Sequence, residues 1–452
     1  MAENVSKQSS KNHIKIDELK RALQSGDTDN AISLATQALD NLENSLENTK
    51  EIALEKSEVL YILSVAQRTK GLIGEATETI KTLIANDPNY ARAHQENGYL
   101  NVSIGNQPGA ATAFARATRL NPALLSSWQK LAQLYGELNH TEGQKFATQR
   151  LKYLTQLPVE IRGARDLMYE GKLGLADTVC RRFLQNNKHH AEAMLLLAEV
   201  GIKLKLYHKA EFLLESCMEI HPKHEAARAE FVQLLSKLGK FGLAKLQAEI
   251  LLNQYPNNHQ YLAAKASAMV GVGEVEQAID LYQQVLGERN DLPGIQLLLG
   301  HAHKANGNIA QAVAAYQQAY KIRADFGDAF WSLANTKTYR FTDNELTLMQ
   351  TQLDKVDIEQ DDKAHLEFAL AKAYEDRKQF DTAFSYYQNG NTIKNQRNLY
   401  SQTKIGEQIE AQKSVFTADF FKAHQNLGEQ SPAPIFIVGL PRAGSTLLEQ
   451  IL

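Results

Sequence analysis

The stretch ARAHQENGYLNVSIGNQPGAATAFARATRLNP, residues 91–122, decides the fold of this chain. It reads as two helices joined by a turn that contains Gly105 and Gly109. Gly98 in the first helix and Ala110 in the second are small, which lets the two helices approach closely. Pro122 ends the second helix because proline has no backbone N–H to donate. The stretch therefore predicts a tightly packed helix pair.

The same pattern returns at a constant interval along the chain. The central alanine recurs at this interval in two runs: Ala76 and Ala110, then Ala176, Ala210, Ala244, Ala278 and Ala312. Twelve positions before it stands a small residue, as at Gly98, Ala198, Ala266 and Gly300, and twelve after it often a proline, as at Pro88, Pro122, Pro222 and Pro256. A helix pair repeated with a period of about 34 residues resembles the tetratricopeptide repeat. The resemblance implies a mainly α fold, an α-solenoid whose stacked pairs form a right-handed superhelix.

One unit of the array departs from the pattern. Gln144 stands at the alanine position of the unit from Leu125, and the next alanine, Ala176, comes two positions too soon, so the register slips there. Trp128 and Tyr135 still match the start of the family pattern. The units are expected to begin near Ser57, Ala91, Leu125, Leu157, Ala191, Glu225, His259 and Pro293.

Beyond the array the pattern becomes irregular. Thr342 or Asp343 is expected to cap a helix over residues 345–353, without an ordinary second helix, and the acidic residues 357–362 form a solvated connection. The sequence therefore predicts six segments for the whole chain. They are a disordered N-terminus (1–13), an N-terminal helical pair and extension (14–56), the repeat array (57–326), an irregular helical connector with a final repeat (327–398), a helix and linker (399–433), and the start of a further domain (434–452).

The last segment has the pattern of an anion-binding loop. Residues 435–438 are β-branched or aromatic and predict a buried strand, while Ser445 and Thr446 precede an apolar run with helical spacing. A helix start that follows a Gly-rich turn offers free N–H groups to phosphate or sulfate. Gly439 and Gly444 enclose four residues, as in the Walker A loop, but Ser445 replaces its lysine, which disfavours a nucleotide triphosphatase.

The run Pro441-Arg442-Ala443-Gly444-Ser445-Thr446 resembles the 5′-phosphosulfate-binding loop of sulfotransferases. It is most similar to the loop in tyrosylprotein sulfotransferases and in bacterial proteins that join tetratricopeptide repeats to a sulfotransferase domain. The resemblance implies that Arg442 contacts the phosphosulfate of 3′-phosphoadenosine-5′-phosphosulfate (PAPS), and that Gly444 to Thr446 hold its 5′-phosphate. Ala443 replaces the usual Ser or Thr and removes one hydroxyl; Ser445 replaces the commoner Thr and keeps it. Residues 331–335, 339–341 and 416–421 also resemble the connector of the bacterial proteins.

The implied activity is transfer of a sulfuryl group from PAPS to a hydroxyl, with a protein tyrosine as the expected acceptor. Arg442 would stabilise the charge that develops on the leaving diphosphate. The family's catalytic base and 3′-phosphate site would lie beyond Leu452, so we expect the 452-residue chain alone to be inactive. The alternative is a non-catalytic tetratricopeptide scaffold for protein–protein interactions, with the loop as a remnant.

Composition adds further limits. A net charge of −3 gives no argument for binding nucleic acid or an anionic membrane. The chain shows no apolar run of about 18 residues and no signal-peptide core, which predicts a cytoplasmic protein. Cys180 and Cys217 are expected to be buried, reduced thiols.

The array itself suggests partners rather than cofactors. A face lined by the first helices of the units is expected to dock a protein or peptide, with a spacer or an oligomerisation scaffold as the alternative. Histidine pairs such as His189 and His190 lack the spacing of metal ligands on one helix face, so no metal site is predicted.

Overall fold

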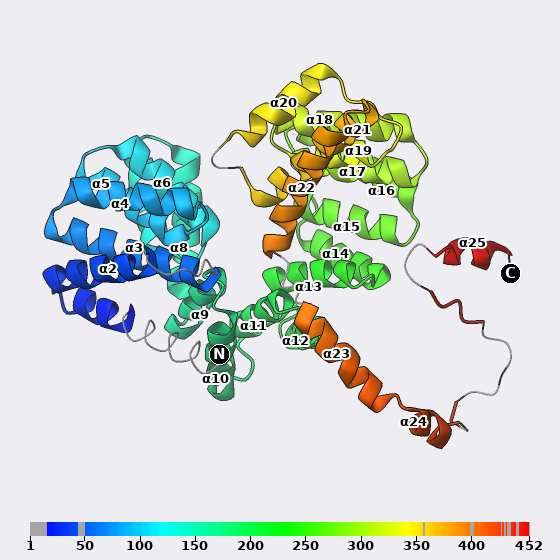
Figure 1. Cartoon of the computed structure of the whole chain (residues 1–452), viewed down its shortest axis with the longest axis horizontal. Helices are drawn as coiled ribbons and strands as arrows, with labels where there is room; N and C mark the ends of the chain where they lie inside the picture. Colours follow the sequence, from blue (N-terminus) through cyan, green and yellow to red (C-terminus); the bar gives the residue numbers. More distant parts are fainter. Residues whose placement is uncertain are drawn as a thin grey trace. The chain divides into compact units, whose positions relative to one another are not determined.

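The structure, a computed structural model, describes residues 16–43, 50–355, 358–397, 402–425, 427–428, 431, 435–439 and 443–451. The chain divides into two compact units, Met1–Ala369 and Leu370–Leu452. In the first unit helices follow one another in pairs (Figure 1). The segment 1–13, expected to be disordered, lies outside the described residues.

The first helix of each pair is called the A helix and the second the B helix. Most A helices have 13 residues and most B helices 14. Residues 16–24 and α2 (Thr28–Glu43) form a pair that precedes the array. The A helices are α3 (Lys50–Lys70), α5 (Ala91–Ser103), α7 (Leu125–Glu137), α9 (Val159–Tyr169), α11 (Ala191–Lys203), α13 (Glu225–Lys237), α15 (His259–Gly271), α17 (Pro293–Ala305) and α19 (Gly327–Ala334). The B helices are α4 (Ile73–Asn86), α6 (Gln107–Leu120), α8 (Thr141–Gln156), α10 (Leu173–Asn186), α12 (Tyr207–Ile220), α14 (Phe241–Gln254), α16 (Val275–Glu288), α18 (Ile309–Ile322) and α20 (Asp343–Leu353).

The central alanines lie where the A and B helices cross. Every one of them is fully buried: Ala76, Ala110, Ala176, Ala210, Ala244, Ala278 and Ala312. The partner position in the A helix is equally tight, because a Cβ at Gly98 would lie 2.8 Å from the Phe114 ring. A Cβ at Gly300 would likewise collide with Tyr316. The small residues of the pattern therefore make room for aromatic rings of the facing B helix, which confirms their predicted role.

The register slip lies within α9 and not before it. α9 begins at Val159, one full period after the start of α7 at Leu125, but it has 11 residues instead of 13, so α10 begins two positions early. The expected unit start at Leu157 was therefore two positions too early, since Leu157 is the C-cap of α8. The following B helix still buries Ala176 and Cys180 completely.

A weak seam accompanies this shortened helix. From α2 to α19, each B helix packs closely on the A helix that follows it, except that α8 and α9 do not approach to this extent. A helices of successive units also contact each other directly, as α3 does α5, α9 does α11 and α11 does α13. The pairs α5–α7 and α7–α9 approach less closely. The helices therefore stack continuously before α7 and after α9, and they pack less closely from α7 to α9.

The connector is more regular than its sequence suggested. The start of α20 follows the start of α19 by the same interval that separates the starts of α5 and α6, so α20 stands at the B position of the repeat. The pair is otherwise irregular, as expected, because α19 has 8 residues, α20 has 11, and residues 335–342 separate them. Thr342 is the cap: its hydroxyl accepts from the Glu345 N–H, and the Glu345 side chain accepts from the Thr342 N–H.

Glu345 is the polar centre of this connector. Its Oε1 accepts hydrogen bonds from the hydroxyls of Tyr320 at 2.8 Å and Tyr339 at 2.5 Å. Its Oε2 accepts from the N–H and the hydroxyl of Thr342, both at 2.9 Å. Burial acts to raise the pKa of Glu345, but these bonds outweigh it and lower the pKa below its usual value. One carboxylate thereby joins α18, the loop after α19 and the start of α20.

We expected the acidic stretch 357–362 to be solvated, but its last residue is buried. Asp362, in the first turn of α21 (Gln360–Asp376), is buried. Its two carboxylate oxygens each accept a hydrogen bond from Arg323 Nη2 at 2.8 Å, and one of them also accepts from the Gly327 N–H at 3.0 Å. Burial raises the pKa of Asp362 to about 6 in spite of the charge of Arg323. The carboxylate therefore joins the start of α21 to the start of α19.

The second unit begins inside α21. The end of α21 packs against α22 (Phe380–Arg397), where the rings of Tyr374 and Tyr386 stack at 5.4 Å and Tyr387 donates to Glu375 at 2.8 Å. This is the further helix pair that the sequence predicted. Two helices follow where one was expected, α23 (Gln402–Val415) and α24 (Ala418–Ala423), and neither buries a residue.

The strand expected over residues 435–438 is not formed. Residues 435–439 carry no ladder hydrogen bonds, and Phe436 and Val438 are 85% and 92% exposed. A strand needs the backbone of a neighbouring strand, and the described part of the chain contains none. The helix expected after the loop is present as α25 (Ser445–Ile451), without buried residues.

Replacing Gly98 by alanine tests the close approach. The added Cβ meets the Phe114 ring, so we expect Gly98→Ala to destabilise the fold by about 1–3 kcal/mol. Gly287→Ala in α16 is the matched control, because nothing lies within 4 Å of its added Cβ; there alanine should stabilise the helix by about 0.5–1 kcal/mol. Urea denaturation followed by circular dichroism measures both, and equal midpoints would contradict the packing argument.

Glu345→Gln tests the connector. Loss of charge-assisted bonds should destabilise the protein by about 1–3 kcal/mol at pH 7. Because the folded pKa is lowered, this contribution is present above the ordinary pKa of 4.5 and is lost as the pH falls through the lowered value.

The difference between wild type and Glu345→Gln should therefore be constant from pH 7 to about pH 5 and shrink below it. Glu215→Gln, at an exposed site in α12, should show neither effect. A difference that persists unchanged into acid would show that the charge of Glu345 is not what stabilises the connector.

Candidate functional site

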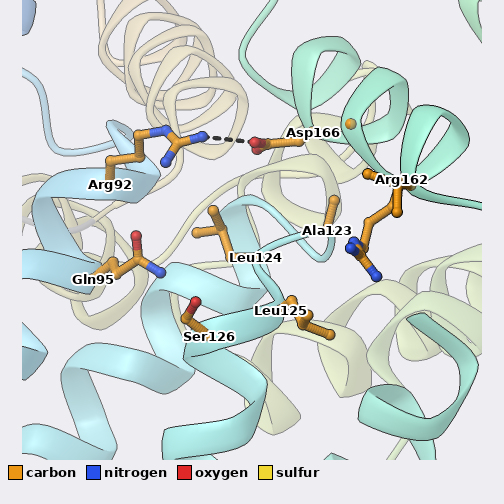
Figure 2. Close-up of a pocket in the computed structure, with 10 residues that line it drawn as sticks. Arg92, Gln95, Ala123, Leu124, Leu125, Ser126, Arg162 and Asp166 are labelled. Atoms are coloured by element: carbon orange, nitrogen blue, oxygen red, sulfur yellow. Dashed lines mark hydrogen bonds and ion pairs between the residues drawn. The ribbon is translucent and has the colours of Figure 1, made fainter. Parts of the chain in front are cut away.

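A cavity of about 260 Å³ opens between α5, α7 and α9. It lies at the seam, where the A helices separate, and its walls come from A helices and the loop before α7. Figure 2 shows polar side chains on opposite walls and leucines between them. The lining residues are Arg92, Gln95, Ala123, Leu124, Leu125, Ser126, Val159, Arg162, Gly163 and Asp166.

At one side of the cavity Arg92 forms ion pairs with two carboxylates. Arg92 Nη2 donates to Asp166 at 2.6 Å, and Arg92 Nε donates to Glu170. Asn121, itself buried, donates to the other oxygen of Asp166 at 2.6 Å (Figure 2 shows the Arg92–Asp166 pair). Burial raises the pKa of Asp166 despite the charge of Arg92. The Arg92 guanidinium is therefore committed to two carboxylates, and it links α5 to α9 across the seam.

Arg162, which lies on α9 as Asp166 does, is the second cation that lines the cavity. The Arg162 guanidinium donates through Nη1 to the Leu154 carbonyl at 3.3 Å and pairs with no carboxylate of the described residues. Figure 2 shows its side chain directed away from Asp166, although the two residues are one helical turn apart. Apolar surface lies beside it, because Val159 is 70% exposed.

A second charged network continues along the A helices. Arg165, 8% exposed, donates to Glu199 of α11 at 3.1 Å and to Glu192 at 3.4 Å, while its Nε has no partner. Tyr153 of α8 donates to Glu192 at 2.6 Å, and His224 lies 3.2 Å from the same carboxylate. These contacts connect α8, α9, α11 and α13.

Burial shifts several of these carboxyl groups. It raises the pKa of Glu199, against the opposing charge of Arg165, and the pKa of Glu230 on α13. It also raises the pKa of Glu96 on α5, although Arg68 donates to that carboxylate. Burial acts in the same direction on Glu192, but the hydrogen bonds from His224 and Tyr153 outweigh it and lower the pKa. The A helices thus carry charges that are partly removed from water.

The loop predicted to bind phosphosulfate is described in part. Pro441 and Arg442 lie outside the described residues, so the cation of the predicted site is not placed. Gly444 has φ +89°, a left-handed conformation that favours glycine, and α25 begins at the next residue, Ser445. A Cβ at Gly439 would lie 3.3 Å from that of Ala443, so the two ends of the loop are close. Ser445 and Thr446 are the first two residues of the helix, rather than the N-terminal cap expected from the sequence.

The cysteines and histidines take structural positions. Cys180 and Cys217 are free and fully buried, as predicted, and burial raises their pKa to about 12 and about 11. His190 and His224 accept hydrogen bonds from the first turns of α11 and α13 and so act as N-caps. Within the described residues no group of three His, Cys, Asp or Glu side chains could hold a metal ion.

Residues 270–335, which contain α16 to α19, match the tetratricopeptide repeat family. The chain contains tetratricopeptide repeats. An uncharacterized protein of Aquifex aeolicus (strain VF5) is 24% identical over 293 residues, which are 63% of this chain and 34% of that protein. The chain thus spans about a third of the length of this curated relative.

Solved structures with similarity to this chain include repeat proteins. MamA from Desulfovibrio magneticus RS-1 has 15% identity and a TM-score of 0.34, covering 36% of this chain and 96% of that one. A thermophilic TPR protein of Thermus thermophilus has 19% identity and a TM-score of 0.33, covering 38% and 93%. No helix of the described residues is both long and apolar enough to cross a bilayer.

The sequence had named no residue of the repeat face. The repeat period did contain a signal for this face. Arg92 and Ser126 are the second residues of α5 and α7, and Gln95 is the fifth residue of α5. Reading the polar residues at these repeated positions would have pointed to the A helices. Arg162 lies in the part of α9 that keeps the register, one period after Trp128 of α7, so the period gave its position as well.

The buried thiols give a simple test. Since the thiolate is the reactive form, an aromatic disulfide reagent at pH 8 should modify neither Cys180 nor Cys217 in the native protein and both in denaturant. Absorbance of the released thiol measures this directly. Rapid modification of native protein would show that these units open far more often than their burial indicates.

Proposed function

We propose that this chain is a protein-interaction scaffold whose A-helix face holds an extended segment of a partner protein. The proposal rests on the location of the carboxyl groups whose pKa is raised by burial. Four carboxyl groups with raised pKa lie on A helices of the array, namely Glu96, Asp166, Glu199 and Glu230, whereas Asp87 and Asp362 have a raised pKa outside them.

Such groups reduce the stability of the fold. A carboxylate withdrawn from water costs free energy unless its partners compensate fully, and Glu230 makes no hydrogen bond or ion pair with the described residues. A spacer would be served by neutral side chains at these positions. Ionisable groups with pKa values perturbed by burial are typical of functional sites. Stacked helix pairs also present a groove that suits extended peptides.

Selection of short random peptides displayed on phage tests this proposal. Peptides enriched on the wild type are then measured against Glu199→Gln/Glu230→Gln, which changes the A-helix face. The control, Glu215→Gln/Glu219→Gln, makes the same charge change on the exposed side of B helix α12.

We expect the A-helix variant to bind roughly three- to ten-fold more weakly and the B-helix variant to bind normally, because only the former removes contacts to the peptide. Circular dichroism melting confirms that both variants are folded. Failure to enrich any peptide would favour the spacer, whereas equal binding by all three proteins would show that Glu199 and Glu230 do not contribute to peptide binding.

We propose a second function for the C-terminal loop: in a chain that carries a complete sulfotransferase domain, residues 441–446 bind PAPS, the donor for sulfuryl transfer to a tyrosine hydroxyl. The sequence of the loop supports this, as do the left-handed Gly444 and the helix start at Ser445. Arg442 is proposed to contact the phosphosulfate on the strength of the sequence resemblance. The N–H groups of the first turn are suited to the 5′-phosphate.

Calorimetric titration of the full-length protein with 3′-phosphoadenosine-5′-phosphate tests the loop. We expect binding by the wild type and a loss on the order of ten-fold or more in Arg442→Ala, since a charge-assisted contact is removed. Arg182→Ala, at an exposed site in α10, is the control. Absence of binding by the wild type would leave the scaffold as the function of the chain.

A further inference from the structure

We infer that the cavity between α5, α7 and α9 binds one acidic side chain of the partner segment. This inference rests on the proposed scaffold function and assigns a ligand chemistry to one part of the A-helix face.

The charges of the cavity decide the sign of the ligand. Arg92 Nη2 lies 2.6 Å from Asp166, and Arg92 Nε donates to Glu170. Glu170 also pairs with Lys172 at 2.8 Å, so two cations and two carboxylates neutralise one another. Arg162 remains, with a single hydrogen bond to a carbonyl and no carboxylate partner in the described residues. A guanidinium has five N–H donors in a planar fork that matches a carboxylate. The cavity therefore offers one uncompensated positive charge.

Its size favours a side chain over a small molecule. At about 260 Å³ the cavity is below the range of about 300–1,000 Å³ that is typical of small-molecule sites. It opens on the face of the stack that suits an extended chain, so the backbone of the ligand can remain outside while one side chain enters.

The remaining walls indicate the neighbouring residue. Val159 is 70% exposed and Leu125 also lines the cavity, so aliphatic surface contributes to its walls. Ser126 on the far side is exposed and supplies a hydroxyl for peptide backbone (Figure 2), whereas the buried Gln95 amide donates to Ser127 at 2.8 Å. The best-matched segment thus carries an aliphatic side chain close to its Asp or Glu.

A positional library of short peptides, acetylated at the N-terminus and amidated at the C-terminus, tests the inference. Blocked ends ensure that a side chain and not a chain terminus supplies the carboxylate. Fluorescence anisotropy compares each Glu peptide with its Gln counterpart on the wild type, on Arg162→Gln and on Arg162→Lys. Arg182→Gln, which removes an exposed charge on α10, is the matched control.

On the wild type and on Arg182→Gln we expect Glu peptides to bind on the order of ten-fold more tightly than Gln peptides. The preference should vanish in Arg162→Gln and persist, at reduced size, in Arg162→Lys. The Glu-to-Gln comparison on the wild type needs no variant, so the inference remains testable even if a substitution impairs folding.

The outcomes separate the two proposals. Peptides that bind without a preference for Glu, or whose preference survives Arg162→Gln, overturn the assigned chemistry and leave the scaffold function standing. A library in which no peptide binds the wild type, together with an empty phage selection, overturns both.

Discussion

A single helix pair of this chain cannot bury its own apolar face, and that constraint governs the whole structure. Burial is achieved only when each B helix packs on the next A helix, and the packing distance is set by small residues at the crossing. Ala110 is fully buried beside Phe114, whose ring fills the space above Gly98. Because the same crossing recurs at each period, the stability of the array is close to a sum over neighbouring interfaces.

The A-helix face shows how this simple rule is modified for another purpose. Its charges link helices that the apolar contacts do not, as Arg92 does between α5 and α9. Ion pairs of this kind are directional and partly desolvated, so they fix side-chain positions at the expense of stability. A surface with fixed charges is preorganised for a partner, since less side-chain freedom is lost when the partner binds.

The sequence predicted the repeated part of the structure well, and the reason is physical. A constant period with small residues at fixed positions has one economical packing, so the alanines, the turn glycines and Thr342 lie where the pattern indicated. The cavity was not predicted because it depends on how closely α5, α7 and α9 approach one another, which the period alone does not show. The strand at 435–438 was predicted from composition alone, and its formation requires partner strands that the described residues do not supply. Arg442 stays a sequence-based prediction.

The seam between α8 and α9 has a consequence for how the chain folds. Where nearest-neighbour interfaces carry the cooperativity of a solenoid, the weakest interface divides it into blocks that open and close separately. The apolar clusters follow this division, because Leu154 and Leu157 belong to the cluster on the N-terminal side and Ile161 to the one that follows. The two blocks should therefore nucleate independently and dock late, with the Arg92 ion pairs closing the joint between them. The array is therefore a single repeated fold that forms from two separately folding blocks.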